Sequence, residues 1–314
     1  MSATVTETVP AAATTTMTGA PAERRDLATQ ILHADEEAYA KQLAPKGGKE
    51  DMWQGGDVYY PNPPKVAVDI TVGDLTGREQ EFTIKKNGFC LAKQDTKFMK
   101  TNEDIKNTDK IKNEYYPEMA AWLKELTGAP IVKVIHHGSR VSTSSYGANS
   151  IKKEDIATVT KPGPAVFGAH LDQSSWQGCN VIHKHMPDEC ESYLHGRCMI
   201  VNAWRPIKTV YKHPFGCADA STVPHQDLVV RANRWVNEIR ESMGIKPNPT
   251  VHKWYYKHAM QPDEVLVFKQ WDNQGNVRAC PHSAFIDPEY EDSYPRESIE
   301  VRAILVWPEG TSEL

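Results

Sequence analysis

Short strand-like runs fill the second half of the chain, and they constrain the fold more than any other feature of the sequence. Runs rich in β-branched and aromatic residues, separated by loops of varied length, occur at 165–172, 198–204, 254–256, 265–270 and 299–307. Strands spaced this widely favour a sandwich or jelly roll over a sheet built from βαβ units. The sequence contains no visible internal repeat. We therefore expect a mainly β protein with flanking helices.

The first half of the chain is expected to add flanking elements to this β core. Residues 1–20 form a tract of Ser, Thr, Ala and Pro with few large apolar side chains, which predicts a disordered leader. Residues 21–314 are predicted to form a single domain, with helical and hairpin elaborations on its N-terminal side.

Local patterns predict what these elaborations are. Apolar residues at helical spacing predict a surface helix over 22–43, and Gly, Pro and Asn predict a long ordered loop over 47–64. Extended segments on both sides of a turn predict a β-hairpin over 66–85. A second helix is predicted over 115–126, before a Gly-Ala-Pro stop, and a short strand follows at 131–137.

Composition argues against several classes of protein. The 41 acidic and 36 basic residues give a net charge of −5, and the scattered basic residues argue against nucleic-acid binding. A run of about 18 apolar residues, which a membrane span needs, does not occur. Six cysteines without a CxxC pair, and an N-terminus without a signal segment, predict reduced thiols and a cytoplasmic location. We expect a small molecule as the partner, while the oligomeric state stays open.

A candidate metal site lies at the start of the strand-rich half. In Phe167-Gly-Ala-His170-Leu-Asp172, the period of a strand directs His170 and Asp172 to the same face. Two imidazoles and one carboxylate form a facial triad that leaves three adjacent coordination positions open for a cosubstrate and O₂. A more distant histidine, His282, would complete this set. The alternative is a surface loop with an Asp-capped turn.

The last predicted strand carries a second candidate site. Its residues divide into a polar face with Arg296, Ser298, Glu300 and Arg302, and an apolar face with Ile299, Val301, Ala303, Leu305 and Trp307. In a closed barrel covered by helices, the polar face points into the lumen, where an arginine needs an anion as its partner. The alternatives are that Arg296 lies in solvent and that Arg302 pairs with Glu300.

Nine segments, in order along the chain, carry a resemblance to a known family. They are Asn87-Gly-Phe89, Ala169-His-Leu-Asp-Gln-Ser174, Asn202-Ala-Trp-Arg-Pro206, Cys217-Ala-Asp-Ala-Ser221, Trp254-Tyr-Tyr256, Pro262-Asp-Glu-Val265, Lys269-Gln-Trp-Asp272, Pro281-His-Ser-Ala-Phe285 and Arg296-Glu-Ser-Ile-Glu-Val-Arg302. The sequence from about residue 65 to 307 resembles the fungal gibberellin-desaturase and AsaB-like hydroxylase/desaturase family of Fe(II)/2-oxoglutarate-dependent dioxygenases.

This resemblance implies a fold, a chemistry and a set of site residues. The implied fold is a double-stranded β-helix, a jelly roll of the cupin type. The implied cofactor is Fe(II), held by His170, Asp172 and His282, with 2-oxoglutarate and O₂ as cosubstrates. Arg296, assisted by Ser298, would bind the distal carboxylate of 2-oxoglutarate, and Arg302 is the reserve candidate.

Other polar residues are weaker candidates for substrate binding. Asn202 and Arg205 occur where an apolar strand turns polar, and each is predicted either to line the pocket or to join a structural hydrogen-bond network. Arg140 has the same two interpretations. Among further histidines, His183 and His185 are expected in an exposed loop, and His225 at a helix start. His136 and His137 are expected near the mouth of the site.

Three functions remain open at this stage. The resemblance implies an enzyme that hydroxylates or desaturates an unactivated C–H bond of a small secondary metabolite. A metal-dependent cupin hydrolase or isomerase could use the same three ligands without Arg296 and Ser298. A non-catalytic jelly-roll binding module would use His170 and Asp172 only as a hydrogen-bonded pair. The loops at 47–64 and 138–150 are expected to define the substrate.

Overall fold

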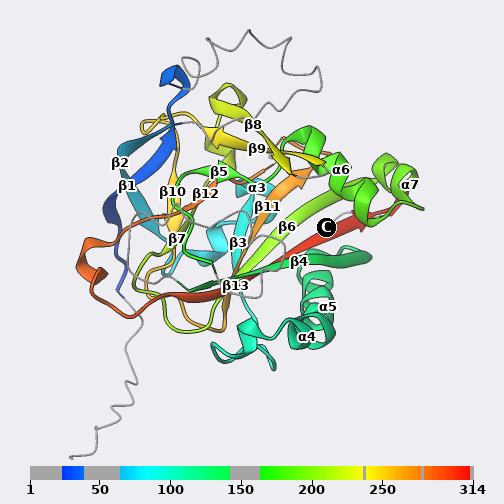
Figure 1. Cartoon of the computed structure of the whole chain (residues 1–314), viewed down its shortest axis with the longest axis horizontal. Coiled ribbons are helices and arrows are strands. Elements are labelled where there is room, and N and C mark those ends of the chain that lie inside the picture. Colours follow the sequence, from blue (N-terminus) through cyan, green and yellow to red (C-terminus); the bar gives the residue numbers. More distant parts are fainter. Residues whose placement is uncertain (1–22, 39–63, 142–162, 236–237, 277–278, 312–314) are drawn as a thin grey trace, which may run out of the picture.

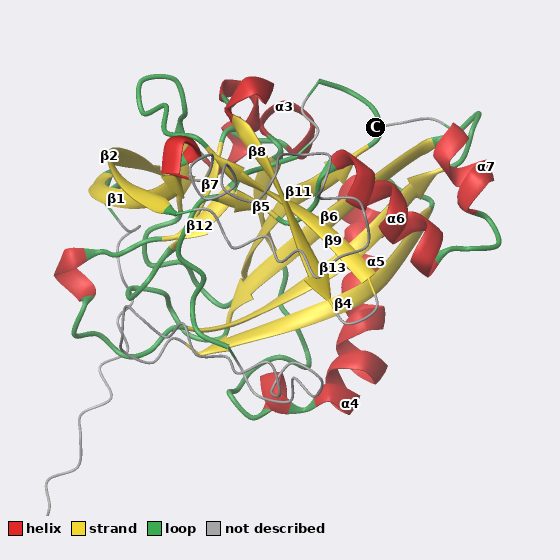
Figure 2. Cartoon of the chain, turned by 45° about the horizontal axis from the view of Figure 1, so that its top comes forward, coloured by secondary structure: helices red, strands yellow, loops and turns green. Residues whose placement is uncertain are grey.

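The architecture consists of two β-sheets with helices on the outside. The computed structural model describes residues 23–38, 64–141, 163–235, 238–276 and 279–311. Figures 1 and 2 show the two sheets side by side, with most of the helices around the smaller one. The predicted leader, and most of the loops predicted at 47–64 and 138–150, lie outside the described residues, whereas residues 138–141 form the end of a strand and not a loop. That 21–314 form one domain stays a prediction.

The larger sheet has eight strands. Their spatial order is β1 (Leu27–Ala34), β2 (Lys65–Asp74), β10 (Trp254–Tyr256), β7 (Phe215–Ala218), β12 (His282–Ala284), β5 (His170–Leu171), β9 (Glu238–Ile245) and β8 (Leu228–Trp235). Neighbours in this order come from distant parts of the sequence, and only β1–β2 and β8–β9 are consecutive antiparallel pairs. Long connections that cross between sheets therefore build this fold, as the jelly-roll prediction requires.

The smaller sheet has five strands and carries most of the helices. Its order is β3 (Phe89–Lys93), β11 (Glu264–Asp272), β6 (Arg197–Pro206), β13 (Glu297–Trp307) and β4 (Ile131–Val141). The described part of the chain has the α-helices α3 (Ile84–Asn87), α4 (Thr108–Lys110), α5 (Tyr116–Thr127), α6 (Ser175–His185) and α7 (Cys190–His195). Together these elements confirm the prediction of a mainly β protein with flanking helices.

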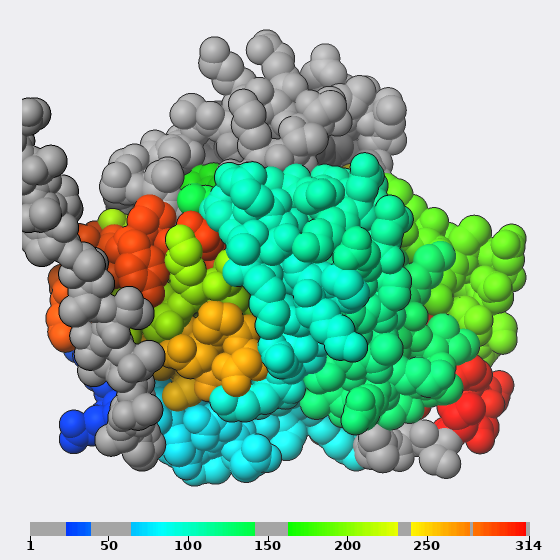
Figure 3. All heavy atoms as spheres, turned by 90° about the horizontal axis from the view of Figure 1, so that it is seen from below, coloured from blue at the N-terminus to red at the C-terminus, as the bar shows by residue number. Residues whose placement is uncertain are grey.

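The two faces of β13 separate a helix-covered core from an inner polar surface. Ile299, Val301, Ala303 and Leu305 are fully buried and belong to the same apolar cluster as Met119 and Leu123 of α5. The segment with α4 and α5 forms the blue-green surface seen from below in Figure 3. The opposite face points toward the larger sheet, where Trp204, Phe268 and Cys217 share a second apolar cluster. The predicted strand phase is therefore confirmed.

The N-terminal elements differ from the predictions. The predicted helix over 22–43 is wrong, because β1 occupies Leu27–Ala34 and pairs with β2 along its whole length. Leu27 and Ile31 are buried on one face of β1, and a spacing of four satisfies the period of a strand as well as that of a helix. The hydrogen-bond ladder between β1 and β2 makes this segment a strand instead of a helix.

The predicted hairpin over 66–85 is also wrong. The strand β2 pairs with β1 on one side and with β10 on the other, and the chain after Asp74 becomes helical instead of extended. Thr83 begins α3 as a capping residue, since its hydroxyl accepts a hydrogen bond from the backbone N–H of Lys86 at 3.1 Å. A capped turn thus replaces the expected return strand.

The remaining elements lie close to their predicted positions. The helix predicted over 115–126 is α5, which a π-helical turn at 111–115 precedes and Gly128, with φ 67°, ends. The strands predicted in the second half are β6, β10, β11 and β13, and the strand at 131–137 continues to Val141 as β4. The run at 165–172 is the exception, because only His170 and Leu171 of it form β5.

The close contact between α5 and the smaller sheet gives a stability prediction. Replacing Leu123, which is fully buried against β13, by Ala leaves a cavity and is expected to lower the free energy of unfolding by about 2–5 kcal/mol. Urea denaturation followed by circular dichroism measures this change. The matched control is Lys124→Ala, at an exposed position of the same helix, with an expected change below about 0.5 kcal/mol. Equal effects of the two substitutions would contradict this packing.

Candidate metal centre

Two short strands of the larger sheet bring the predicted metal ligands together. His170 of β5 is the direct antiparallel partner of His282 of β12, and Asp172 follows β5 immediately. The labels β5 and β12 mark this place near the middle of the larger sheet in Figure 1. Sheet pairing therefore joins two histidines that are far apart in the sequence.

The three side chains converge through one atom each. The Nε2 atoms of His170 and His282 lie 3.4 and 3.8 Å from Oδ1 of Asp172, and the two ring centroids are 4.3 Å apart. All three potential ligand atoms lie within 4.8 Å of one another. The structure thus assembles the complete set of three predicted ligands.

The partners of the other ring nitrogens fix the tautomers. Nδ1 of His170 lies 2.8 Å from the carbonyl oxygen of Gly168, and Nδ1 of His282 lies 3.2 Å from that of Cys280. A carbonyl only accepts hydrogen bonds, so Nδ1 of each ring donates and the neutral ring keeps the lone pair of Nε2. Two imidazole lone pairs and a carboxylate oxygen then face one another, which is the donor set of a divalent metal.

Burial and charge keep this set in its metal-binding form. Burial lowers the pKa of His282 to about 3, so this ring is neutral at pH 7. Burial opposes the ionisation of Asp172, but the positive charge of Arg302 and the contacts with His170 and His282 together outweigh it and hold the pKa of Asp172 well below its ordinary value. Phe268 and Phe215 lie against the ring of His282, at centroid distances of 4.8 and 5.6 Å, and restrict its rotation.

A second polar cluster lies at the start of β13, on the same inner face. Arg296 is 3% exposed, donates from Nη1 to the carbonyl oxygen of His213 at 2.6 Å and lies over the ring of Trp204 at 5.4 Å. Among the described residues, its Nε and the hydroxyl of the fully buried Ser298 have no hydrogen-bond partner, and no acidic residue forms an ion pair with Arg296. Burial lowers the pKa of Arg296 to about 9. This cluster therefore suits an anion.

Comparisons with known proteins agree with this geometry. A family model described as "Oxidoreductase/YMDC permease-like domain" matches residues 33–306. The alpha-ketoglutarate-dependent dioxygenase phiK of Fungal sp. is 34% identical over 242 residues, which cover 76% of this chain and 83% of that protein. The hydroxylase/desaturase efuI of Hormonema carpetanum is 31% identical over 258 residues, or 78% of this chain and 85% of that protein.

The chain belongs to this family of fungal dioxygenases and hydroxylase/desaturases. The resemblance seen in the sequence is thereby confirmed.

A solved structure supports the fold of this dioxygenase family member. The iron and alpha-ketoglutarate-dependent endoperoxidase NvfI superposes with a TM-score of 0.73 at 20% identity, covering 90% of this chain and 99% of that chain. The predicted jelly roll is confirmed by this match. Within the described residues, every helix is too short or too polar to span a membrane.

The weaker substrate-binding candidates of this dioxygenase lie in three different places. Arg140 of β4 is the register partner of Ser298, and its charge acts on Arg296, so it lies near the anion cluster. Asn202 faces the metal centre and contacts Asp172. Arg205 lies on the opposite face of β6 and donates to Tyr115 and to two backbone carbonyls, so the structure does not bring it to the site.

The other histidines lie in different parts of the structure. His136 is the register partner of Arg302 and faces the inner side, where burial lowers its pKa to about 4. His137 points to the helix side and lies 2.7 Å from the hydroxyl of Tyr116. His183 and His185 lie in the last turn of α6 and not in a loop as predicted, while His225 begins a 3₁₀ turn.

One residue of the site was missed by the sequence reasoning. Gln270 of β11 is fully buried, and its side-chain oxygen accepts a hydrogen bond from the backbone N–H of Asp172 at 3.2 Å. The amide nitrogen of Gln270 has no partner among the described residues. A buried amide inside the run Val265-Leu-Val-Phe-Lys-Gln270 was the available signal, because such a group needs a specific partner.

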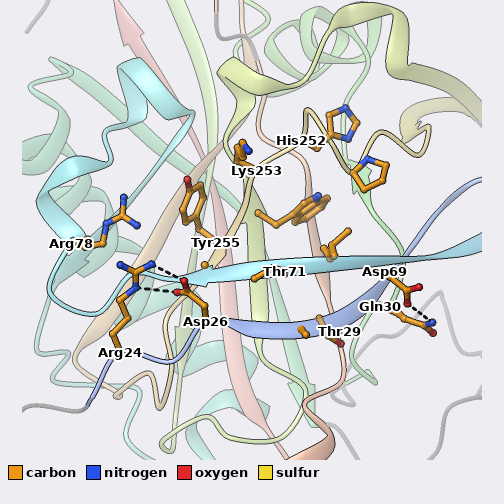
Figure 4. A pocket seen from close by; sticks show the side chains of 15 residues that line it. Arg24, Asp26, Thr29, Gln30, Asp69, Thr71, Arg78, His252, Lys253 and Tyr255 are labelled. Carbon is orange, nitrogen blue, oxygen red and sulfur yellow. Dashed lines mark hydrogen bonds and ion pairs between the residues drawn. The ribbon is translucent and has the colours of Figure 1, made fainter.

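Two further features of the surface lie away from this centre. A groove of about 790 Å³ on the outer side of β1, β2 and β10 is lined by Arg24, Asp26, Arg78 and Tyr255, and its charges pair locally, as Arg24 and Asp26 do in Figure 4. His183, Cys190 and Glu191 form a second group of potential metal ligands, in which His183 and Glu191 are exposed.

The two groups of ligands give a prediction about metal content. Asp172→Ala and His282→Ala are expected to abolish stoichiometric binding of Fe(II), since each removes one of three ligand atoms. Plasma emission spectrometry after anaerobic loading and desalting measures the bound iron. Glu191→Ala, which removes a carboxylate of the exposed group, is the matched control with unchanged iron content. Loss of iron only in Glu191→Ala would show that the metal binds to the group on α6 and α7 instead.

Proposed function

We propose that this chain is an Fe(II)- and 2-oxoglutarate-dependent oxygenase that hydroxylates or desaturates an unactivated C–H bond of a small secondary metabolite. His170, Asp172 and His282 would hold the metal, and Arg296 with Ser298 would hold 2-oxoglutarate. This proposal rests on two features of the same site: three convergent ligand atoms, and a buried arginine that has no acidic partner among the described residues. Relatives of the same family are named dioxygenase and hydroxylase/desaturase.

The residues of the chain would position the reactants and exclude water. When bound together, Fe(II), 2-oxoglutarate and O₂ supply the oxidising power for cleaving the C–H bond. The carbonyl groups of Gly168 and Cys280 hold the two imidazoles in the required tautomer, and Phe215 and Phe268 shield His282 from solvent. Three protein ligands leave positions open for a cosubstrate, unlike the four ligands of a closed structural zinc site.

Arg296 is a better candidate for the distal carboxylate of 2-oxoglutarate than Arg302. The guanidinium of Arg302 is already engaged with Asp172 and Asn202, whereas Nε of Arg296 and the hydroxyl of Ser298 are buried without partners in the described part of the chain. An unpaired buried polar group lowers stability unless a ligand satisfies it. This observation favours the oxygenase over a cupin hydrolase or isomerase, which has no need of a second carboxylate site.

The partner and the location of the chain complete the proposal. A small-molecule substrate agrees with the family, and Arg140 and His136 on the inner face of β4 are its proposed contacts. The two residues flank Gly138, where an added Cβ would meet nothing within 4 Å, so this part of the inner face has open space. We also propose a cytoplasmic location, in line with six free cysteines. Nucleic-acid and membrane binding are not part of the proposal.

The test of the proposed function is spectroscopic. Anaerobic addition of Fe(II) and 2-oxoglutarate to the purified protein is expected to produce a metal-to-ligand charge-transfer band in the visible spectrum. Admission of O₂ with a panel of pathway intermediates should then give succinate and one product, identified by mass spectrometry as hydroxylated or desaturated. Absence of both the band and succinate would rule out the oxygenase.

The anion cluster gives a separate prediction about 2-oxoglutarate. Arg296→Gln is expected to raise the KM for 2-oxoglutarate about 10- to 100-fold, because a charge-assisted contact of about 1.5–3 kcal/mol is lost. Ser298→Ala should have a smaller effect in the same direction. Steady-state kinetics at saturating Fe(II) measure both values. An unchanged KM in a folded Arg296→Gln protein would remove Arg296 from the cosubstrate site.

A further inference from the structure

The two oxygens of the Asp172 carboxylate have different surroundings. Oδ1 faces Nε2 of His170 and of His282. Oδ2 instead accepts a hydrogen bond from Nη2 of Arg302 at 2.6 Å and a second from Nδ2 of Asn202 at 3.0 Å. The carboxylate is therefore held from the side opposite to the imidazoles.

The two donors are themselves fixed by the smaller sheet. Asn202 of β6 and Arg302 of β13 are direct register partners, and Nε of Arg302 donates to Oδ1 of Asn202 at 3.0 Å. Nδ2 of Asn202 donates both to Asp172 and to Oε1 of Glu300, at 2.9 Å. Reversing this amide would direct its oxygen at two carboxyl groups, so the network selects one orientation. Asn202 is fully buried, which leaves it no alternative partner in solvent.

We propose that Arg302 and Asn202 are positioning residues that hold Oδ2 of Asp172, so that Asp172 offers only Oδ1 to the metal. This inference rests on the proposed metal centre and deepens it. It assigns Arg302 and Asn202 to the metal ligand and not to 2-oxoglutarate or the substrate. A carboxylate whose Oδ2 is held by hydrogen bonds cannot rotate to coordinate the metal through both oxygens. The coordination position that the second oxygen would occupy therefore stays vacant for the cosubstrate.

The charge of Arg302 allows a positioning role to be distinguished from a purely electrostatic role. A cation next to the metal repels it, so charge alone predicts that removing Arg302 strengthens metal binding. Loss of the hydrogen bonds that orient a ligand predicts the opposite, since such changes weaken metal affinity about 10- to 100-fold. Asn202 is neutral, so its replacement reports on orientation without a change of charge.

The experiment measures Mn(II) affinity of the full chain in the absence of 2-oxoglutarate, from the electron paramagnetic resonance signal of free Mn(II). Arg302→Gln and Asn202→Ala are expected to raise the Kd for Mn(II) about 10- to 100-fold, and Arg302→Lys, which keeps one donor, by less. Lys208→Gln is the matched control. It removes an exposed cation that pairs with Glu297 at the start of β13 and not with Asp172, so its Kd for Mn(II) should equal that of the wild type.

Each outcome has one meaning. Wild-type Mn(II) affinity in Arg302→Gln and Asn202→Ala, or tighter binding in Arg302→Gln, overturns the positioning role but leaves the metal centre intact. Equal binding by the wild type and Asp172→Ala overturns the proposed metal centre itself. Thermal melting shows which variants fold, and if Arg302→Gln does not fold, Asn202→Ala and Arg302→Lys decide the question alone.

Discussion

The pairing of β5 with β12 is the contact on which the candidate metal centre depends. Only two residues of β5 form ladder hydrogen bonds, yet they place His170 directly opposite His282 and leave Asp172 at the adjacent turn. Two imidazole nitrogens and one carboxylate oxygen then face one another with no hydrogen atom between them. Their lone pairs repel one another unless a cation lies between them. The surrounding sheets hold this arrangement, because β12 also pairs with β7 and β5 also pairs with β9.

The smaller sheet supplies the complementary half of the site. Arg296 directly precedes β13, and Ser298, Glu300 and Arg302 follow on the inner face of this strand, so one segment reaches both the anion cluster and the carboxylate of Asp172. Burial raises the pKa of Glu300 to about 7, and the nearby charge of Asp172 acts in the same direction. The apolar outer face of the same strand rests on α5. The apolar core and the proposed cosubstrate site therefore share a single strand.

Sequence reasoning succeeded where the period of a strand alone decides the outcome. The alternation from Arg296 to Trp307 predicted which side chains point inward, and the short spacing of His170 and Asp172 predicted a common direction. It failed where a distant partner decides, since the apolar residues of 22–43 fit a helix and a strand equally well until β2 is present. Arg205 shows the same limit, because alternation within β6 places it on the helix side, where Tyr115 accepts its hydrogen bond.

The helix α6 packs closely on the smaller sheet near the proposed metal ligand Asp172. This helix begins at its capping residue Ser174, two positions after Asp172, and an added Cβ on its Gly178 would lie 2.2 Å from the ring of Trp271 on β11. The absent side chain at Gly178 therefore allows α6 to pack directly on β11, close to the segment that carries Asp172. A larger residue at Gly178 would separate α6 from Trp271, and so disturb the neighbourhood of Asp172 without replacing any of the three ligand side chains.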